Sequence, residues 1–346
     1  MAITSSLSGD TQNKKKESII QKKSQSISEK TFEIGLRPEL FADFVGQELL
    51  KKNLKIFITG AKKRGEPLVH MLLSGPPGLG KTTLSGIIAK EMGGNLKITS
   101  GPALEKSGDL AALLTSLEKN DIVFIDEIHR LKKPLEEMLY SAMEDFALDL
   151  IVGKGAGAKS MRLSLPPFTL IGATTKLGSI AGPLRDRFGN IAKLQFYTID
   201  EMQQIGERTA KILEIDITSQ ASKRIAHACR STPRISNRIL RQLRDFAHSE
   251  EKECITNEIC SVGFSSLGID IHGLDDHDRQ FLSLIIHTFQ SGPVGISTLC
   301  AAFSEDKETI EEIIEPYLLQ KGFLQRTSQG RIVTEEGKKI IINSNL

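Results

Sequence analysis

The chain has 346 residues, of which 39% are hydrophobic and 25% charged, with a formal net charge of +2 at pH 7. This is ordinary globular composition, and the length suffices for two or three domains that each bury a core. The near-neutral balance excludes a basic, nucleic-acid-binding character for the chain as a whole, so any basic surface is local. No apolar run reaches the roughly 18 residues of a membrane span, and no apolar signal core is present, which favours a cytoplasmic protein. The four cysteines lack metal-binding spacing and indicate buried free thiols.

Residues 1–30 predict a disordered basic tail, because Ser, Gln and Lys dominate and only Ile19 and Ile20 offer local burial. The lysine runs could touch nucleic acid, but a solvated, inert tail is the favoured interpretation. Residues 31–198 then read as an α/β domain. The apolar runs HMLLSG, DIVFIDE and FTLIGATT predict its buried parallel strands, with ligands expected at their carboxyl ends.

Within this domain, residues 147–166 predict a projecting β-hairpin, since two short apolar stretches flank the glycine-rich KGAGAK. Helical periodicity follows over 199–269 and is clearest in DEMQQIGERTAKIL and ASKRIAHACR. Residues 270–346 form a small α+β module that ends as helix, strand, turn and strand. The predicted fold class is therefore α/β with a parallel sheet, followed by two smaller domains.

The stretch GPPGLGKT, from Gly75 to Thr82, matches the phosphate-binding pattern GxxxxGK[ST] between an apolar strand and a helix. Its glycines let backbone N–H groups face anionic oxygens, and the helix N-terminus adds positive potential. Lys81 is expected to reach the β- and γ-phosphates, and the Thr82 hydroxyl to ligate Mg²⁺. A plain glycine-rich turn is the alternative, which the complete match disfavours. The expected ligands are ATP and Mg²⁺.

The stretch FIDEIH supplies two carboxylates at the end of a buried strand. Asp126 is expected beside the Thr82-bound metal, and Glu127 is placed to polarise the attacking water as general base. An ordinary strand-to-loop exit is the alternative, which the upstream phosphate loop disfavours. A single histidine at a helix start is more often a cap or a packed residue, so His129 is assigned no chemistry.

The stretch LRDRFGN carries two arginines about ten residues beyond the GATT strand, and therefore at the domain edge. A phosphate-binding loop lacks a positive group to meet the charge that develops on the γ-phosphoryl at transfer. Arg185 and Arg187 could supply it to a neighbouring subunit, which would make hydrolysis depend on a ring or another head-to-tail assembly. A surface salt bridge with Asp186 is the simpler alternative.

The order of these motifs resembles the AAA+ ATPases, and more narrowly the RuvB family of Holliday-junction branch-migration motors. The resemblance runs in order through residues 33–335. The matching stretches are LRPELFADFVGQ, GPPGLGKTTL, ITSGPALEKSGDLAALLTSLE, FIDEIHRL, MEDFALD, LPPFTLIGATT, GPVGISTL and EPYLLQKGFLQRT. A general AAA+ match would end with the ATP motifs, whereas GPALEK and GFLQRT are typical of the RuvB family.

This resemblance implies an AAA+ large domain over 31–198, a helical lid over 199–269 and a winged-helix DNA-binding domain over 270–346. It implies a homo-hexameric ring that uses ATP to move duplex DNA and migrate four-way junctions during recombination, DNA repair and the SOS response. The implied partners are junction DNA with its duplex arms, the junction-binding protein RuvA, and RuvC within a resolvasome.

The resemblance also implies roles for single residues. Arg187 matches the arginine finger, Thr175 the sensor 1 position that holds the attacking water or γ-phosphate, and Arg234 the sensor 2 position in the lid. Tyr197 and the LRP run at 36–38 match the residues that contact the adenine of the nucleotide. The positions implied to bind ATP are Leu36, Arg37, Gly78, Gly80, Lys81, Thr82, Thr83, Glu144, Asp145, Phe146, Arg185, Tyr197 and Arg234.

Two further surfaces follow from the same resemblance. The hairpin over 147–166 matches the element that docks RuvA, with candidate contacts at Leu148, Leu150 and Val152. The alternative is an apolar face that its own domain covers. Arg326 and Arg331 match the DNA contacts of the winged-helix domain, and the TSQG turn between them could place both at the wing tip. Phosphate contacts suit a motor that moves along any sequence, because they carry no base information.

The chain departs from the family pattern at three positions. Lys176 stands where an arginine is usual, Ser231 where a glycine is usual, and Ser74 where an aromatic residue is common. None removes a group that the chemistry needs. Lys176 replaces a fork-shaped contact by a point charge, so coupling between subunits could differ.

Two other functions compete with a junction motor. A clamp-loader-type AAA+ switch would open a protein ring on DNA and release it without continuous strand exchange; GPALEK and GFLQRT argue against it. A DNA-binding regulator that only senses nucleotide would need neither a general base nor an arginine finger, so Glu127 and Arg187 argue against that function.

Overall fold

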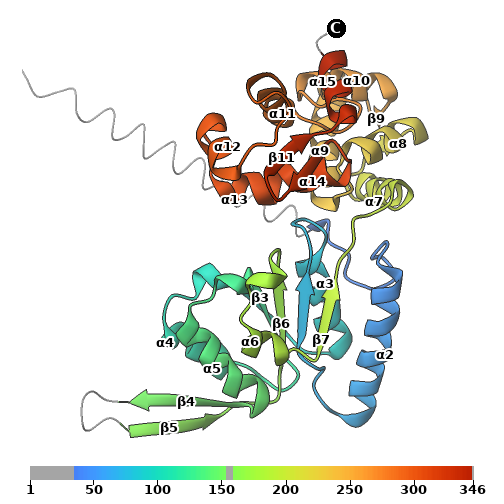
Figure 1. Cartoon of the computed structure of the whole chain (residues 1–346). Helices are drawn as coiled ribbons and strands as arrows, with labels where there is room; N and C mark the ends of the chain where they lie inside the picture. The colour runs from blue at the N-terminus through green and yellow to red at the C-terminus, as the bar shows by residue number, and fades with distance from the viewer. Residues whose placement is uncertain (1–34, 153–158, 345–346) are drawn as a thin grey trace, which may run out of the picture. The chain divides into compact units, whose positions relative to one another are not determined.

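The structure is a computed structural model that describes residues 35–152 and 159–344 (Figure 1). The predicted tail and the glycine-rich centre of the predicted hairpin lie outside these residues. Residues 1–38 form one unit and residues 39–346 a second, and each is described by itself. Across the described ranges, no helix has both the length and the apolar character that a membrane crossing requires.

A five-stranded parallel sheet forms the centre of the large domain, in the order β2-β3-β6-β1-β7. These strands are β1 (Met71–Ser74), β2 (Leu96–Ser100), β3 (Ile122–Asp126), β6 (Thr169–Thr174) and β7 (Asn190–Lys193). Every residue of β1 and β6 is buried, as the unbroken apolar runs predict for parallel strands covered on both faces. The carboxyl ends of β1, β3 and β6 therefore meet at one edge.

Helices cover this sheet. In chain order they are α2 (Glu48–Arg64), α3 (Lys81–Met92), α4 (Ser107–Thr115), α5 (Lys133–Glu144) and α6 (Gly182–Asp186). The helix α3 packs on β2, β3 and β6, and α2 packs on α3. Apolar residues of α4 and α5, among them Leu110, Leu114 and Leu139, form a separate core with Val123 and Ile125 of β3. The predicted α/β core is confirmed.

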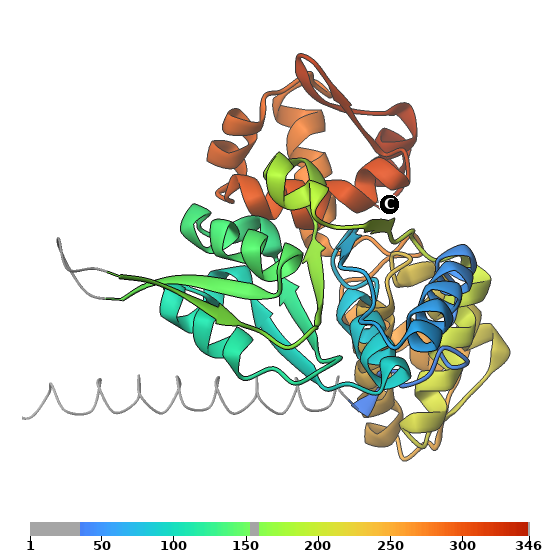
Figure 2. The ribbon, with the colours of Figure 1, turned by 90° about the horizontal axis from the view of Figure 1, so that it is seen from below.

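An antiparallel pair of strands, β4 (Ala147–Val152) and β5 (Lys159–Ser164), extends away from the sheet in both views (Figures 1 and 2). Leu148 is fully buried in the core beside α5, and Leu150 packs against the same core. The prediction that Leu148 contacts a partner is therefore wrong for this conformation, because its own domain covers the side chain. The description does not extend to the side chain of Val152.

The lid is a four-helix domain with one short parallel strand pair. It contains α7 (Ile199–Ile212), β8 (Asp216–Ile217), α8 (Ser219–Ala228), α9 (Pro233–Ser249), β9 (Cys254–Ile255) and α10 (Asn257–Ser266). Threonine side chains accept a backbone N–H at the start of three of these helices, namely Thr198, Thr218 and Thr256. The two helices that periodicity predicted most clearly are α7 and α8.

The last domain combines helices with a two-stranded antiparallel wing. Its elements are α11 (Asp276–Thr288), α12 (Ile296–Phe303), α13 (Lys307–Thr309), η5 (Ile310–Ile314), α14 (Glu315–Gln320), β10 (Leu324–Thr327), β11 (Gly330–Val333) and α15 (Glu335–Ser344). A distinct apolar core, with Phe281, Leu282 and Leu318 fully buried, joins the helices to the wing.

Candidate active site

The phosphate-binding loop connects β1 to α3, as the motif predicted. Gly78 and Gly80 have φ angles of 79° and 97°, a left-handed conformation that glycine adopts without steric cost. Gly80 is the N-cap of α3, so the free N–H groups of the first turn face the loop. Thr82 and Thr83 are half-buried in that first turn. The local structure is suited to an anion.

Lys81 lies within this loop and is only 7% exposed. Its Nζ donates hydrogen bonds to the carbonyl oxygens of Gly75 at 2.7 Å and Pro76 at 2.8 Å. Burial is the main cause that lowers the pKa of Lys81 to about 8; Asp126 opposes the shift, and Arg234 contributes to it. The ammonium group is therefore held by polar contacts at the loop, with a carboxylate close enough to influence it.

Two carboxylates follow the central strand. Asp126 ends β3, and its Oδ1 accepts a hydrogen bond from the backbone N–H of Glu127 at 3.0 Å. Glu127 has a φ of 47°, which turns its side chain out of the strand direction, and it forms an ion pair with Arg130 at 3.2 Å. The side-chain hydroxyl of Thr82 and Oδ2 of Asp126 have no hydrogen-bond partner among the residues the structure describes.

The neighbouring strand β6 ends at Thr174, whose hydroxyl lies 3.0 Å from Nδ1 of His129 and accepts the backbone N–H of Lys176. Burial lowers the pKa of His129, which behaves as a packed residue. Thr175 follows the strand end, and its hydroxyl donates to Glu312 at 3.2 Å. Thr175 therefore lies at the edge of the sheet that carries Lys81 and Asp126.

Two glutamates of the last domain, Glu308 in α13 and Glu312 in η5, contact this strand end. The sequence did not predict this contact. Lys176 forms ion pairs with Glu308, at 3.2 Å, and with Glu312. Neither contact follows from local spacing, because more than 130 residues separate the partners along the chain. Lys176, which stands where an arginine is usual, therefore binds two carboxylates.

The start of α9 in the lid lies against the phosphate-binding loop. A Cβ atom added at Gly78 would stand 2.7 Å from Cγ2 of Thr232 and 3.0 Å from Cβ of Arg234. Arg234 is exposed and lowers the pKa of Lys81. The structure therefore brings Arg234 to the loop. Tyr197, just before α7, is buried, and its hydroxyl donates to the carbonyl oxygen of Leu79 at 3.1 Å.

The two arginines of LRDRF differ in their surroundings. Leu184 and Phe188 are buried and fix the segment on the core. Arg187 is anchored: it donates to the carbonyl oxygen of Pro183 at 2.8 Å and pairs with Glu144 at 3.1 Å. Arg185 is exposed, with no side-chain partner in the described part of the chain. Neither arginine has a contact to its own phosphate-binding loop in this part.

The remaining predicted ATP contacts fall in two other places. Glu144 pairs with Arg187, and Asp145 with Arg162 at 2.6 Å, while Phe146 packs edge-on against Phe168. Of these three residues, Glu144 contacts the arginine at the domain edge, whereas Asp145 and Phe146 contact the β4–β5 pair and the core. Leu36 and Arg37 belong to the unit over residues 1–38, so their role on the adenine side stays a prediction.

In the wing, Arg326 and Arg331 are direct cross-strand partners. Arg326 is 47% exposed and pairs with Glu315. The side chain of Arg331 is only 9% exposed and binds Glu315 at 2.6 Å and Glu311 at 3.0 Å. The register thus brings the two predicted DNA contacts together, but in this conformation the Arg331 guanidinium is occupied by carboxylates.

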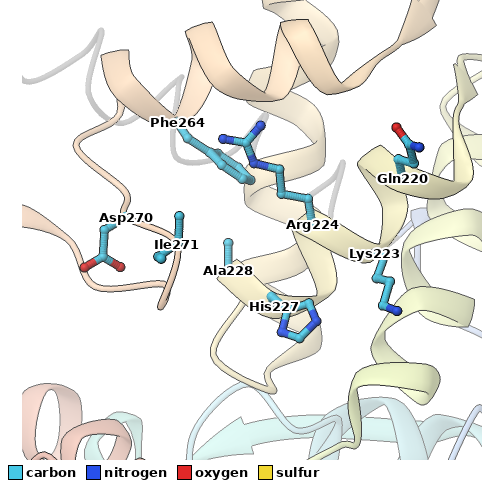
Figure 3. Close-up of a pocket in the computed structure, with 8 residues that line it drawn as sticks. All are labelled: Gln220, Lys223, Arg224, His227, Ala228, Phe264, Asp270 and Ile271. Atoms are coloured by element: carbon cyan, nitrogen blue, oxygen red, sulfur yellow. The ribbon is translucent and has the colours of Figure 1, made fainter. Parts of the chain in front are cut away.

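A cavity of about 330 Å³ in the lid lies apart from these residues (Figure 3). Arg224 stacks on Phe264 there, 5.3 Å from the ring centroid, and donates to Asn257 and Ser261. These contacts satisfy the arginine within its own domain. None of the predicted site residues lines this cavity.

The fold and site together define a P-loop ATPase of the AAA+ class, with a helical lid and a winged-helix domain. The comparisons with known proteins agree. Residues 36–194 match the model described as the Holliday junction DNA helicase RuvB P-loop domain, residues 197–270 the RuvB AAA lid domain, and residues 271–342 the RuvB C-terminal winged helix domain.

Among solved structures, the chain is similar to RuvB of Thermotoga maritima, titled a Holliday junction branch migration motor. The identity is 46%, with 89% of this chain and 98% of that chain covered and a TM-score of 0.82. Two point mutants of that protein match with the same identity and coverage, at TM-scores of 0.83 and 0.81. The chain belongs to the RuvB family, and it is an ATP-hydrolysing enzyme of the helicase class.

Proposed function

We propose that this protein is an ATP-driven motor that assembles as a hexameric ring and moves duplex DNA to migrate Holliday junctions in recombination and repair. The observation that supports the proposal is that two sets of groups suited to ATP hydrolysis lie apart in the subunit. Lys81 and Asp126 converge at the strand ends, whereas Arg187 is held at the domain edge by Glu144 and Pro183. Head-to-tail assembly would bring these two sets together between neighbouring subunits.

In this function the loop N–H groups and Lys81 bind the β- and γ-phosphates. Glu127 accepts a proton from the attacking water, and the Thr175 hydroxyl orients that water or the γ-phosphate. Arg187, supplied by the neighbouring subunit, meets the negative charge that develops at transfer. An arginine supplied in this way contributes a factor on the order of 10³ to 10⁵ in related GTP hydrolysis.

Mg²⁺ fits the same site. The hydroxyl of Thr82 and Oδ2 of Asp126 are hard oxygen donors without a hydrogen-bond partner among the described residues, and this is the ligand chemistry that Mg²⁺ prefers. When bound, the ion would neutralise phosphate charge. Thr82 and Asp126 would hold it, and the Asp126–Glu127 hydrogen bond would keep the carboxylate of Asp126 in position.

The position of the lid would depend on the bound nucleotide, because residues at the start of the lid contact it. Arg234 lies against Gly78 and is proposed to contact the nucleotide as sensor 2. Tyr197 holds the loop carbonyl of Leu79 and is proposed, with Leu36 and Arg37, to form the adenine side. Gly80 and Thr83 complete the loop contacts, and Arg185, Glu144, Asp145 and Phe146 would approach the nucleotide of the adjacent subunit.

DNA binding is proposed at the wing. Arg326 is the exposed cation there, and Arg331 could join it once DNA phosphate displaces the half-buried Glu311. The hairpin β4–β5 is proposed to dock RuvA, with Leu150 and Val152 as candidate contacts, and RuvC would complete the junction-processing assembly. We also propose a cytoplasmic location, because a motor of this kind acts on DNA.

Dissociation of a synthetic four-way junction with ATP and Mg²⁺ tests this function, with and without RuvA. We expect RuvA-stimulated conversion to two duplexes, and no conversion with Lys81→Ala, because that change removes the phosphate-binding cation. Strong ATP hydrolysis without junction movement would contradict the proposal and favour a clamp-loader-type switch, which the family-specific matches over all three domains disfavour.

A further inference from the structure

Arg187 is held at the domain edge more firmly than a surface arginine requires. Its guanidinium carbon lies 4.4 Å from the centroid of the Tyr140 ring, a stacking distance, in addition to the contacts with Pro183 and Glu144. Its side chain is 23% exposed, and its Nε–H is buried without a hydrogen-bond partner in the described part of the chain. An unpaired buried donor is uncommon, so the position of this side chain calls for an explanation beyond its hydrogen bonds.

Tyr140 is a rigid platform. It lies in the long amphipathic helix α5, where the preceding Leu139 and the following Ala142 are fully buried, and its ring packs against the core of the large domain. An aromatic side chain has only two rotatable bonds, so packing of the ring fixes its position. The stacked guanidinium thereby acquires a fixed place relative to the sheet, which the exposed Arg185 next to it does not have.

Two of the partners of Arg187, Glu144 and Tyr140, respond differently to an incoming phosphate. Glu144 is 56% exposed and negatively charged, so a phosphate competes with it directly for the guanidinium. The Tyr140 ring is neutral and holds the guanidinium over its own face by a cation–π contact, so it does not compete with phosphate for the N–H donors. Stacking can therefore persist while the edge of the guanidinium binds phosphate.

We propose that Tyr140 is a positioning residue for ATP hydrolysis, which holds the Arg187 guanidinium by stacking in the orientation that enters the neighbouring subunit's site. Glu144 is the exchangeable anion that binds the same group when no phosphate is present. This inference rests on the proposed role of Arg187 as an arginine finger supplied in trans. It assigns Tyr140 a role in kcat and none in binding nucleotide within its own subunit.

The test compares steady-state ATP hydrolysis by Tyr140→Leu, which removes the ring but keeps an apolar side chain, and Tyr140→Phe, which keeps the ring. Lys133→Ala, an exposed change in the first turn of the same helix, is the matched control. We expect Tyr140→Leu to lower kcat about 5- to 30-fold with the KM for ATP within about 2-fold, as loss of one cation–π contact predicts. Tyr140→Phe should recover most of kcat.

A mixing experiment separates positioning from a folding defect. Tyr140→Leu protein has an intact Lys81 site, and Lys81→Ala protein has an intact Tyr140–Arg187 pair. Mixed rings should therefore regain hydrolysis at the interfaces that join these two halves. If Tyr140→Leu lowers kcat but mixing restores nothing, the residue acts within its own subunit and the inference is overturned.

Arg187→Ala distinguishes failure of this inference from failure of the proposed function. If Arg187→Ala hydrolyses ATP normally, the finger itself is wrong, and the proposed function fails with it. If Arg187→Ala is inactive while Tyr140→Leu keeps a normal kcat, or if Tyr140→Phe is as impaired as Tyr140→Leu, only the positioning role is overturned.

Discussion

At the scale of single residues, the site depends on how burial changes the chemistry of one lysine. Lys81 donates to two loop carbonyls and is almost fully buried, and this burial lowers its pKa to about 8. A protonated lysine is the form that binds phosphate. The affinity for nucleotide therefore depends on the fraction of Lys81 that is protonated before binding.

We predict that the Kd for Mg²⁺-bound ADP rises about 10-fold between about pH 7 and about pH 9. Above pH 8 the free protein carries neutral Lys81, while the bound phosphates favour its charged form, so binding takes up a proton and weakens as the pH rises. Isothermal titration in two buffers of different ionisation enthalpy measures both effects. Lys81→Arg is the control, because its guanidinium stays charged and should remove the pH dependence. An equal pH dependence in both proteins would contradict the mechanism.

A second residue-scale prediction concerns close approach of the lid. Gly78 and Gly93 have nearly equal φ angles, 79° and 74°, but an added Cβ meets Thr232 and Arg234 at Gly78 and nothing within 4 Å at Gly93. Each change to alanine should cost about 1 kcal/mol of unfolding free energy from left-handed strain. Only Gly78→Ala should also weaken nucleotide binding, because it displaces the lid. Thermal unfolding and titration distinguish the two, and equal binding by both variants would refute the lid contact.

At the scale of elements, the wing shows that the positions of arginines in the sequence do not reveal which of them is free to bind DNA phosphate. The register places Arg326 and Arg331 side by side, yet Glu315 between them is fully buried and Arg331 is covered with it. A buried carboxylate that loses its partner is strongly destabilising. The two arginines should therefore respond differently to the same substitution.

We predict that Arg331→Ala lowers the unfolding free energy of the winged-helix domain by about 3 kcal/mol, since Glu315 loses its closest buried partner. Arg326→Ala should cost less stability, since Arg326 is itself 47% exposed and Glu315 keeps Arg331 as its buried partner. It should reduce the salt dependence of DNA binding by about one unit of slope, as loss of one phosphate contact predicts. Chemical unfolding and binding at several salt concentrations test both. If Arg326→Ala leaves the salt slope unchanged, the wing contact is wrong.

The sequence predicted elements better than it predicted which side chains meet. The phosphate-binding loop, the parallel strands and the antiparallel β4–β5 pair follow from local motif and period, and the α/β fold class is confirmed. Leu148 was assigned to a partner surface because alternation alone does not say which strand face its own domain covers. The contacts of Tyr140 with Arg187 and of Lys176 with Glu312 join distant segments, and no spacing rule predicts them.

At the scale of the whole molecule, one subunit does not complete the proposed reaction site. The subunit carries Lys81, Asp126 and Glu127 at the strand ends, and Arg187 at another edge on a platform of its own. An arginine held in this way can act on a neighbour's nucleotide only if the subunits assemble head to tail. Hydrolysis should then depend on assembly, and so on protein concentration.

The measurement that tests this claim most directly is ATP hydrolysis by mixtures of Arg187→Ala and Lys81→Ala proteins. Each variant alone should bind its neighbours but hydrolyse little ATP, since one lacks the finger and the other the phosphate-binding lysine. Mixtures should regain activity, because an intact Lys81 site then faces an intact Arg187 at some interfaces. Normal hydrolysis by Arg187→Ala alone, or mixtures no more active than the separate variants, would contradict a site shared between subunits.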